Sequence, residues 1–530
     1  MPQERHRHNL HVINAPLIVG LAVAVAVIAS AALARLTRVP APCFLVLAGL
    51  AVSGTPGIEA IRLPPDVVFL GFLPPLLYAA AFLTAPREVR ENWLSILLLA
   101  VGLTAATLFA VAGAAWVAVA ALGAGSAFVL GAVLGPTDPI SATSVIGSTS
   151  APEKLRTILE AESLVNDGVG LVAFSIALTA VEKGSFSAAD GLVKFVEISA
   201  GGIAFGVVVA VVVERVRRHV HAAEIEIPIS LLTPYLAYIP AERLHVSGIL
   251  ATVACGVYLG WRAEGIFRPE VRLQSLVFWD VLTFVLGSVL FVLLGTQFRR
   301  VLDGLGSYSA WTLTRDALLV FGVVFVVRLL WMFTVPHLVA VLGRSRDWAE
   351  IDPWRDRFVL GWCGMRGALS LAAALSIPAT VAHRDEILFL TFTTILAGLV
   401  VLGIPLPWLL ERLGFGPAGP SDEELAARRA VAEAALRRLD ELAAEDWVAN
   451  ELIEPLRMLY ESRIGRLEAR RDGTSVGAGR YQRLRRELLA AERDELRRRE
   501  RAGMIGFATA RRIERQLDHE ESALQAPSPR

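Results

Sequence analysis

Long apolar segments recur along most of this chain and constrain its fold more than any other feature. A helix needs roughly 17 to 25 predominantly apolar residues to cross the hydrocarbon core of a bilayer, and runs of that kind fill residues 16–411. A helix also satisfies its own backbone hydrogen bonds, which lipid cannot do. The sequence therefore predicts an all-α, polytopic membrane protein.

Reading the runs in order predicts about thirteen membrane-spanning helices. The predicted spans are residues 16–36, 41–56, 66–84, 93–122, 125–148, 156–181, 191–213, 226–240, 246–261, 274–296, 316–342, 358–381 and 386–411. The second and eighth runs are short, so twelve or fourteen spans remain open.

Composition separates this apolar part from the end of the chain. The 530 residues are 54% hydrophobic and only 19% charged, which is too apolar for a soluble enzyme of this length. Residues 412–530, in contrast, hold 23 Arg and 22 acidic residues. We predict a membrane domain over 1–411 and a cytosolic helical tail over 412–530, with helical segments such as Glu424–Leu442 and Tyr481–Glu500 separated by the Gly-rich stretch 472–479.

Several classes of function are disfavoured by what the sequence lacks. The charges of the tail nearly cancel, so nucleic acid is not expected as a partner. No HExxH or GxSxG motif occurs in a span, so we expect no hydrolase and no enzyme. The cysteines Cys43, Cys255 and Cys363 have no metal-binding spacing and are expected to be buried apolar residues.

The loop charges predict an orientation in the membrane. Alternate loops carry 16 basic residues on one side, against 10 on the other when the N-terminal segment is included. Because the side richer in Lys and Arg is cytoplasmic, we expect the N-terminus outside the cell and the tail in the cytoplasm.

The fifth predicted span contains a carboxylate between two prolines. Pro136 and Pro139 bracket Thr137 and Asp138, and two prolines three residues apart should interrupt the helix in mid-membrane. Freed carbonyl groups and helix ends at such a break can hold a dehydrated cation, as they do in transporters. The alternative is a kinked helix with a capped Asp.

The sixth predicted span contains the sequence ESLVND. Helical spacing places Ser163, Asn166 and Asp167 on one face, with Glu162 adjacent. These oxygen ligands suit a hard cation such as Na⁺. A desolvated carboxylate among them can exchange a proton for a cation near neutral pH, so one group can serve both substrates.

Two arginines lie within later spans. An ionisable residue at this depth is costly and is therefore a functional candidate, with a structural ion pair as its alternative. Arg328 has no charged neighbour in its own span, which favours a structural pair with another helix. Arg366 lies in a Gly-rich segment followed by Pro378, where a site role and a structural role both remain open. Glu197 and Asp280 are expected to pack between helices.

Both the fifth and the twelfth predicted spans are interrupted by Gly and Pro. Interrupted helices at corresponding positions of two halves indicate an inverted-repeat transporter. We predict six-helix repeats over spans one to six and eight to thirteen.

Four motifs occur in order along the chain: GPTDP in the fifth span, ESLVND in the sixth, FWDVLTFVLGSVLFVLLG in the tenth and GMRGALSLAAALSIP in the twelfth. With them the chain resembles, over roughly residues 14–411, the Na⁺/H⁺ exchanger family of monovalent cation:proton antiporters, in its NhaP-like Asn-Asp branch. The resemblance implies a homodimer in the cell membrane that serves pH and sodium homeostasis. It implies no cofactor, since Na⁺ is the transported substrate.

The resemblance also implies roles for individual residues. Asp167 would bind the proton or the cation alternately, with Asn166 as its neighbour. Asp138, the Thr137 carbonyl and Ser163 would complete the Na⁺ site at the crossing of the fifth and twelfth spans.

The remaining implied roles concern support of the site and the third span. Glu162 would pair with Arg328, and Arg366 would lie beside the unwound part of the twelfth span. Archaeal and some bacterial members carry an acid in the third span where this chain has Ala79, which bears on the approach to the site and on the choice of Na⁺ or K⁺. A K⁺/H⁺ antiporter and a non-transporting cation sensor that signals through the tail remain alternatives.

Overall fold

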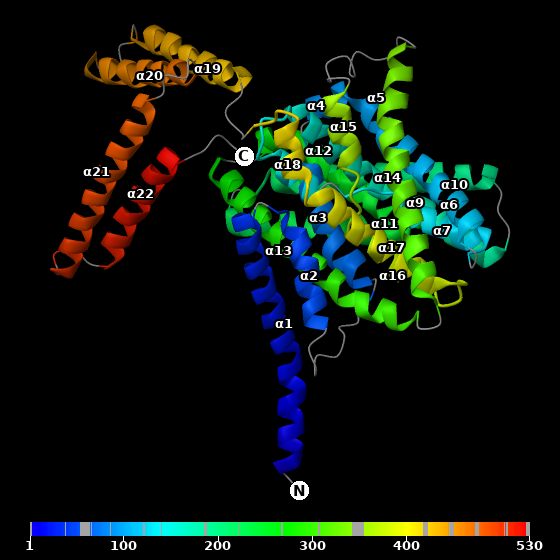
Figure 1. The fold of residues 1–530 in the computed structure, drawn as a ribbon. Coiled ribbons are helices and arrows are strands. Elements are labelled where there is room, and N and C mark those ends of the chain that lie inside the picture. Colours follow the sequence, from blue (N-terminus) through cyan, green and yellow to red (C-terminus); the bar gives the residue numbers. More distant parts are fainter. Residues whose placement is uncertain are drawn as a thin grey trace. The chain divides into compact units, whose positions relative to one another are not determined.

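The computed structural model describes most of the chain. The residues that it does not describe are 1–2, 38, 54–63, 65, 85, 120–121, 139, 185–187, 221, 267–268, 306–307, 342–353, 417–421, 444, 446–449, 472–475, 503, 505–506 and 526–530. Among the described residues, the regular elements are helices (Figure 1). The all-α prediction is therefore confirmed.

Helices up to the middle of the chain follow the apolar runs closely. They are α1 (Gln3–Thr37), α2 (Ala41–Ser53), η1 (Val67–Phe72), α3 (Leu73–Leu83), α4 (Pro86–Glu91), α5 (Trp93–Leu97), η2 (Leu98–Leu103), α6 (Thr104–Ala118), α7 (Ala124–Val133), α8 (Ile140–Ile146), α9 (Glu153–Lys183) and α10 (Ala188–Arg217).

The second part of the apolar region continues the same pattern. It contains α11 (Ala223–Arg243), α12 (Gly248–Ile266), α13 (Pro269–Asp303), α14 (Ala310–Val341), α15 (Arg355–Trp362), α16 (Ala368–Leu375), α17 (Arg384–Ala397), η3 (Gly398–Gly403) and α18 (Leu406–Arg412). The segments η1 to η3 are single π-helical stretches within longer helical runs.

Seven helices in the described part of the chain are long and apolar enough to cross a membrane, and four shorter apolar helices accompany them. Two of the predicted spans each contain two short helices separated by a non-helical segment. The predicted span 125–148 is divided into α7 and α8, and the predicted span 358–381 is divided into α15 and α16. The exact number of spans and the internal repeat remain predictions.

Contacts between the helices define two groups within the apolar part. In the first, α2 packs on α13, and α3, α10 and α11 pack on α12. In the second, α6 packs on α7 and α14, α7 packs on α9, and α14 packs on α15. Glycines lie at the helix crossings of the first group. In lipid the hydrophobic effect does not drive helices together, so close backbone packing at small residues provides the attraction.

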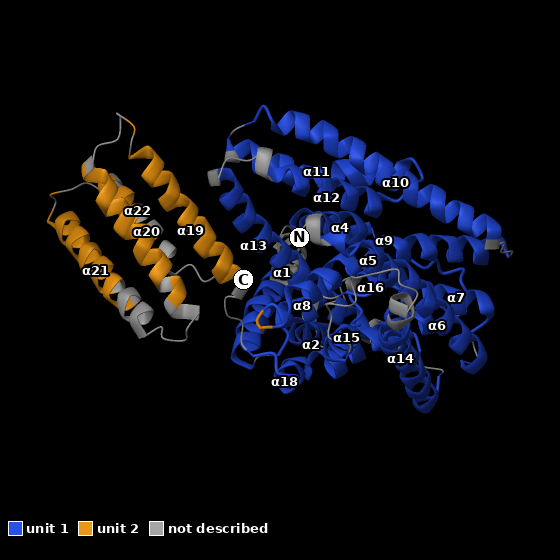
Figure 2. Cartoon of the chain, turned by 90° about the horizontal axis from the view of Figure 1, so that it is seen from above, with its two compact units in different colours: residues 1–147, 151–416 blue, residues 148–150, 417–530 orange. Residues whose placement is uncertain are grey.

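The chain divides into two compact units (Figure 2). One contains residues 1–147 and 151–416, and the other contains residues 148–150 and 417–530. The second unit holds α19 (Asp422–Leu442), α20 (Asn450–Arg471), α21 (Val476–Arg501) and α22 (Phe507–Gln525), in which α19 packs on α20 and α21 packs on α22. Ion pairs join the members of each pair, such as Arg429 to Glu468 at 2.9 Å and Arg493 to Asp518 at 2.7 Å.

The structure differs from the sequence predictions at several positions. The tail has two more helices than the two named segments, α20 and α22. Helix α20 contains the interior Pro455, which weakens its sequence signal. Glu197 and Asp280 do not pack between helices within the chain, because both side chains are exposed. The three cysteines are buried and unpaired, as expected. The predicted breaking residue Pro139 lies outside the described residues.

A glycine crossing between α2 and α13 gives a test of this packing. A Cβ atom added at Gly295 would lie 2.2 Å from the carbonyl oxygen of Val46, whereas one added at Gly322 of α14 would meet nothing within 4 Å. We expect Gly295→Ala to destabilise the protein by about 1–3 kcal/mol through overpacking. Gly322→Ala should leave the melting temperature of the purified protein unchanged or higher. Equal melting temperatures for the two variants would contradict the close crossing.

Candidate functional site

The interruption between α7 and α8 exposes backbone groups in the apolar interior. Helix α7 ends at Val133 and α8 begins at Ile140. The connection contains Thr137, which is buried, and Asp138, which is half-buried. Proline at position 136 cannot donate a backbone hydrogen bond, which explains why the helix ends here.

The interruption between α15 and α16 meets the first one directly. Helix α15 ends at Trp362 and α16 begins at Ala368. The backbone N–H of Asp138 donates a hydrogen bond to the carbonyl oxygen of Met365 over 2.9 Å. Two segments more than 200 residues apart in the sequence are thus joined by backbone hydrogen bonding at their breaks.

Arg366 satisfies the carbonyl groups that the first break leaves free. Its Nη1 atom donates to the carbonyl oxygens of Gly135 and Pro136, and the side chain is 2% exposed. A cation is favoured there because the carboxyl end of a helix such as α7 carries partial negative charge. Arg366 thus binds the backbone of the first break, and the choice between its site role and its structural role stays a prediction.

Glycines permit the two breaks to approach so closely. A Cβ atom at Gly367 would lie 1.7 Å from Oδ2 of Asp138, and one at Gly170 of α9 would lie 2.0 Å from Cγ of Pro136. A Cβ at Gly364 would lie 2.2 Å from Cδ of Arg328. The glycines that flank Arg366 in the sequence therefore make room for the side chains of Asp138 and Arg328.

Glu162 of α9 is fixed by an ion pair inside the protein. Arg328 of α14 donates to its two carboxylate oxygens over 2.6 Å and 3.0 Å, and both side chains are 1% exposed. The Nε atom of Arg328 donates to the carbonyl oxygen of Leu360 in α15, over 3.0 Å. The geometry of the expected Glu162–Arg328 pair is thus present, and it joins three helices.

A short chain of hydrogen bonds extends from this ion pair to the first break. The hydroxyl of Thr137 donates to Oε1 of Glu162 over 2.9 Å and accepts a hydrogen bond from Nδ2 of Asn166 over 2.7 Å. The Oδ1 atom of Asn166 is buried and has no hydrogen-bond partner among the described residues. Asn166 therefore has one acceptor oxygen available for another ligand.

Asp167 has the opposite environment to Glu162, although only five residues separate them on α9. Its side chain is half-buried and makes no hydrogen bond or ion pair with any residue that the structure describes. Asp138 lies close enough to interact with it electrostatically. Ser163, one turn earlier on α9, is also half-buried and forms no hydrogen bond within the described part of the chain.

The predicted site residues thus fall into two sets. Hydrogen bonds join a supporting network of Thr137, Glu162, Asn166 and Arg328, and Arg366 binds the adjacent backbone at Gly135 and Pro136. Asp138, Ser163 and Asp167 are half-buried and lie outside the hydrogen bonds of this network. Sequence reasoning missed the carbonyl groups of Gly135, Leu360 and Met365, because every residue type has a carbonyl and only the fold selects which ones are used.

Comparison with known proteins identifies the family. The model of the transmembrane sodium/hydrogen exchanger family matches residues 23–412. The chain belongs to the sodium/hydrogen exchanger family. It is therefore a multi-pass membrane protein of a family of secondary transporters and not an enzyme, as the sequence analysis expected.

Individual relatives agree with this family assignment. An uncharacterised Na⁺/H⁺ exchanger of Mycobacterium tuberculosis is 34% identical over 92% of this chain and 90% of its own length. The low-affinity Na⁺/H⁺ antiporter of Synechocystis is 31% identical over 81% of this chain and 80% of its own length. The solved structure of a sodium proton antiporter from Methanocaldococcus jannaschii superimposes with a TM-score of 0.57, covering 74% of this chain and 99% of that one at 22% identity, which supports the fold.

Removal of Arg328 tests the supporting ion pair. Arg328→Ala leaves the Glu162 carboxylate buried and unpaired, which we expect to cost on the order of 3–5 kcal/mol of stability. The double variant Glu162→Gln with Arg328→Gln should recover part of this loss. The matched control is Arg156→Ala, which removes the partly exposed pair with Glu160 and should cost no more than about 1 kcal/mol.

The measurement is the melting temperature of each purified variant in the same detergent. The pair assignment is wrong if the double variant is no more stable than Arg328→Ala.

Proposed function

We propose that this protein exchanges Na⁺ for H⁺ across the cell membrane, with Asp167 binding either the proton or the cation. One observation carries this proposal: Asp167 is a half-buried carboxylate without a hydrogen-bond or ion-pair partner in the described part of the chain. A carboxylate committed to structure has its oxygens occupied, as those of Glu162 are. A carrier must instead keep its oxygens available to two competing ligands.

The charge balance around Asp167 favours a single monovalent substrate. The site region contains three carboxylates, from Asp138, Glu162 and Asp167, and two guanidinium groups, from Arg328 and Arg366. With all acids ionised the formal sum is therefore −1. One Na⁺ or one proton brings it to zero, so either substrate relieves the cost of a net charge in a low-dielectric interior. This arithmetic supports one-for-one, electroneutral exchange.

The available ligands are hard oxygen atoms. We propose that the carboxylates of Asp138 and Asp167, the hydroxyl of Ser163 and the carbonyl of Thr137 bind Na⁺, with Asn166 beside them. Such donors suit alkali cations and offer little to thiophilic metals. The carbonyls of Gly135 and Pro136 are already occupied by Arg366, so they are not included in the proposed ligand set.

The positions of these residues support a mechanism of alternating access. All of the proposed ligands and supporting residues belong to α7–α9 and α14–α16 or their connections, and the Glu162–Arg328 pair ties α9 to α14 and α15. We propose that this group moves as one body against the group formed by α2, α3 and α10–α13. The second group would hold two protomers together in a homodimer.

The names of the relatives differ in which cations they specify. The printed name of the Synechocystis relative specifies Na⁺, whereas a Bacillus subtilis relative, 30% identical over 70% of this chain and 58% of its own length, is named for sodium, potassium, lithium and rubidium. We propose Na⁺ as substrate, with K⁺ as the alternative ion. A sensor that binds cations without transporting them is the alternative from another class.

Replacement of the proposed carrier tests the central claim. Asp167→Asn can still coordinate a cation through its amide oxygen but cannot exchange a proton, so we expect exchange to be abolished in a folded protein. The matched control is Asp280→Asn, which neutralises an exposed acid on α13 that lies outside the proposed site. The control should retain exchange.

The assay is cation-induced dequenching of a pH-sensitive dye in proteoliposomes, with Na⁺, Li⁺ and K⁺ compared. Na⁺-driven proton flux in Asp167→Asn at normal expression would refute the carrier assignment. If the unmodified protein responds to K⁺ alone, the K⁺/H⁺ alternative replaces Na⁺. If no alkali cation drives proton flux, the sensor alternative is favoured.

We further propose that residues 1–411 form the transport domain and that 412–530 form a cytoplasmic tail that modulates it, with the N-terminus outside. In support, residues 417–530 belong with 148–150 to a second compact unit, and no residue of 412–530 is a proposed ligand. A chain ending after Gly416 should therefore still exchange cation for proton, with a changed pH dependence at most. Initial rates of both forms in liposomes between about pH 6 and 9 provide the comparison. Loss of all exchange from a folded truncated protein would mean that the tail belongs to the transport machinery.

A further inference from the structure

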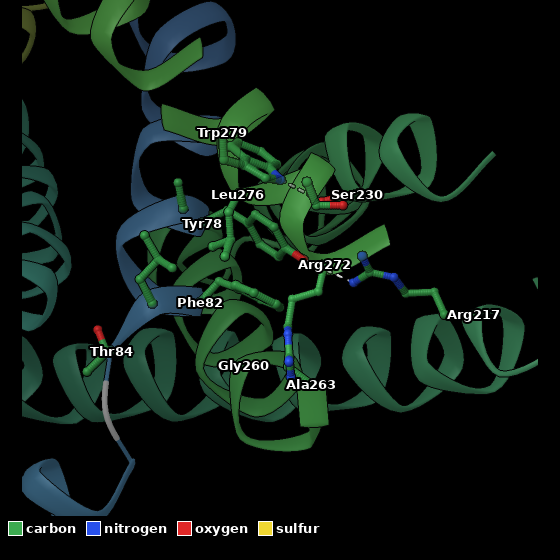
Figure 3. A pocket seen from close by; sticks show the side chains of 13 residues that line it. Tyr78, Phe82, Thr84, Arg217, Ser230, Gly260, Ala263, Arg272, Leu276 and Trp279 are labelled. Atoms are coloured by element: carbon green, nitrogen blue, oxygen red, sulfur yellow. Dashed lines mark hydrogen bonds between the residues drawn. The ribbon is translucent and has the colours of Figure 1, made fainter. Parts of the chain in front are cut away.

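A cavity of about 260 Å³ lies among α3, α10, α11, α12 and α13, and none of the proposed cation ligands lines it (Figure 3). Ala79 of α3 lies on its wall. The 13 lining residues include two arginines and no Asp or Glu. The lining therefore favours a negatively charged ligand.

The deeper arginine belongs to the framework of the cavity. The Nε atom of Arg217 donates to Glu226, and its Nη1 atom donates to the hydroxyl of Tyr78 over 3.4 Å. The side chains of Arg217 and Glu226 are 1% and 3% exposed, so each charge compensates the other. The indole N–H of Trp279 donates to the hydroxyl of Ser230 over 2.8 Å (Figure 3). These contacts fix α10, α11 and α13 around the cavity.

The outer arginine, Arg272, is not compensated in this way. It is exposed and makes no ion pair with any residue that the structure describes. It lies in the first turn of α13, which begins at Pro269, where the helix carries partial positive charge and a cation is disfavoured. Ser275, one turn further into the cavity, has a buried hydroxyl without a hydrogen-bond partner among the described residues. A bound anion would satisfy both groups.

Apolar side chains form the rest of the wall. Phe82, Leu83 and Leu276 line the cavity beside Arg272. Leu83 is 56% exposed, and on α13 the neighbouring Leu273 and Val277 are 66% and 64% exposed. Such a surface is suited to contact with lipid and not with water. The combination of an uncompensated cation, a hydroxyl donor and an apolar wall matches a phosphate group attached to an acyl chain.

We propose that this cavity binds an anionic phospholipid, with its phosphate at Arg272 and Ser275 and the start of an acyl chain against Phe82, Leu83 and Leu276. Arg272 belongs to the loop group predicted to face the cytoplasm, at the level of the lipid headgroups. A lipid bound there would bridge α3, α12 and α13. Because the lipid would bind the folded protein and not the unfolded chain, it should stabilise the folded state by mass action.

The test uses the purified full-length protein and short-chain lipids that dissolve without forming a bilayer. Dihexanoyl phosphatidylglycerol should raise the melting temperature along a saturable curve, whereas dihexanoyl phosphatidylcholine and inorganic phosphate should not. Arg272→Gln should raise at least tenfold the phosphatidylglycerol concentration that gives half of the maximal rise in melting temperature. The matched control is Arg262→Gln, which removes an exposed arginine stacked 5.7 Å from the Tyr258 ring, outside the cavity lining.

A second variant separates loss of charge from loss of space. Ala263→Phe fills the cavity without removing a charge, and it should abolish the response while leaving the lipid-free melting temperature nearly unchanged, since Ala263 is only partly buried. An equal effect of phosphatidylcholine would overturn the role of the anion, and saturation by inorganic phosphate alone would assign the site to a free anion. An equal loss in Arg262→Gln, or a full response in Ala263→Phe, would overturn the site itself.

Discussion

Lipid offers no hydrogen-bond partners, so every backbone group released by a break in a spanning helix must find its partner within the protein. This constraint organises the centre of the molecule. The carbonyls released where α7 ends are satisfied by Arg366, and the N–H of Asp138 is satisfied by the carbonyl of Met365. Each break thus supplies what the other lacks, and neither could exist in the membrane alone. The glycine at 367 belongs to this arrangement because any larger residue would occupy the position of the Asp138 carboxylate.

The same helix presents two acids with opposite environments. Glu162 is held by Arg328 through both of its oxygens, and Arg328 extends to α15 through the carbonyl of Leu360. Asp167 lies beyond the reach of that guanidinium and remains half-buried. A buried ion pair contributes little net stability, since desolvation offsets its attraction. Its value here is positional: it fixes α9, and with it the carboxylate that the proposed exchange requires to be available.

Parts of this arrangement could be predicted from the sequence. Apolar runs mark the helices, and charged residues are costly to bury in a membrane, so the few that occur stand out. Apolar runs located the helices closely, as in α9, because transfer into lipid dominates their energetics. Because few charged residues are tolerated within spans, Glu162, Asp167 and Arg328 could be named as candidates. The structure brings Glu162 and Arg328 together. Which backbone carbonyls serve as partners could not be predicted, since no residue type marks them. The sequence also did not predict that the side chain of Asp280 is exposed. Hydrophobic periodicity and composition do not show which face of a helix contacts a neighbouring helix.

The two groups of helices solve the problem of buried charge differently. Around the proposed ion site, three acids and two arginines leave a formal deficit of one positive charge, which a transported ion can fill and vacate. Around the cavity at Arg217, Glu226 completes the pair, and Arg272 has no ion-pair partner among the residues that the structure describes. The two charge imbalances therefore lie in different groups of helices. The one that a transported ion would fill lies in the group proposed to move, and the one that a lipid would fill lies in the group proposed to stay fixed.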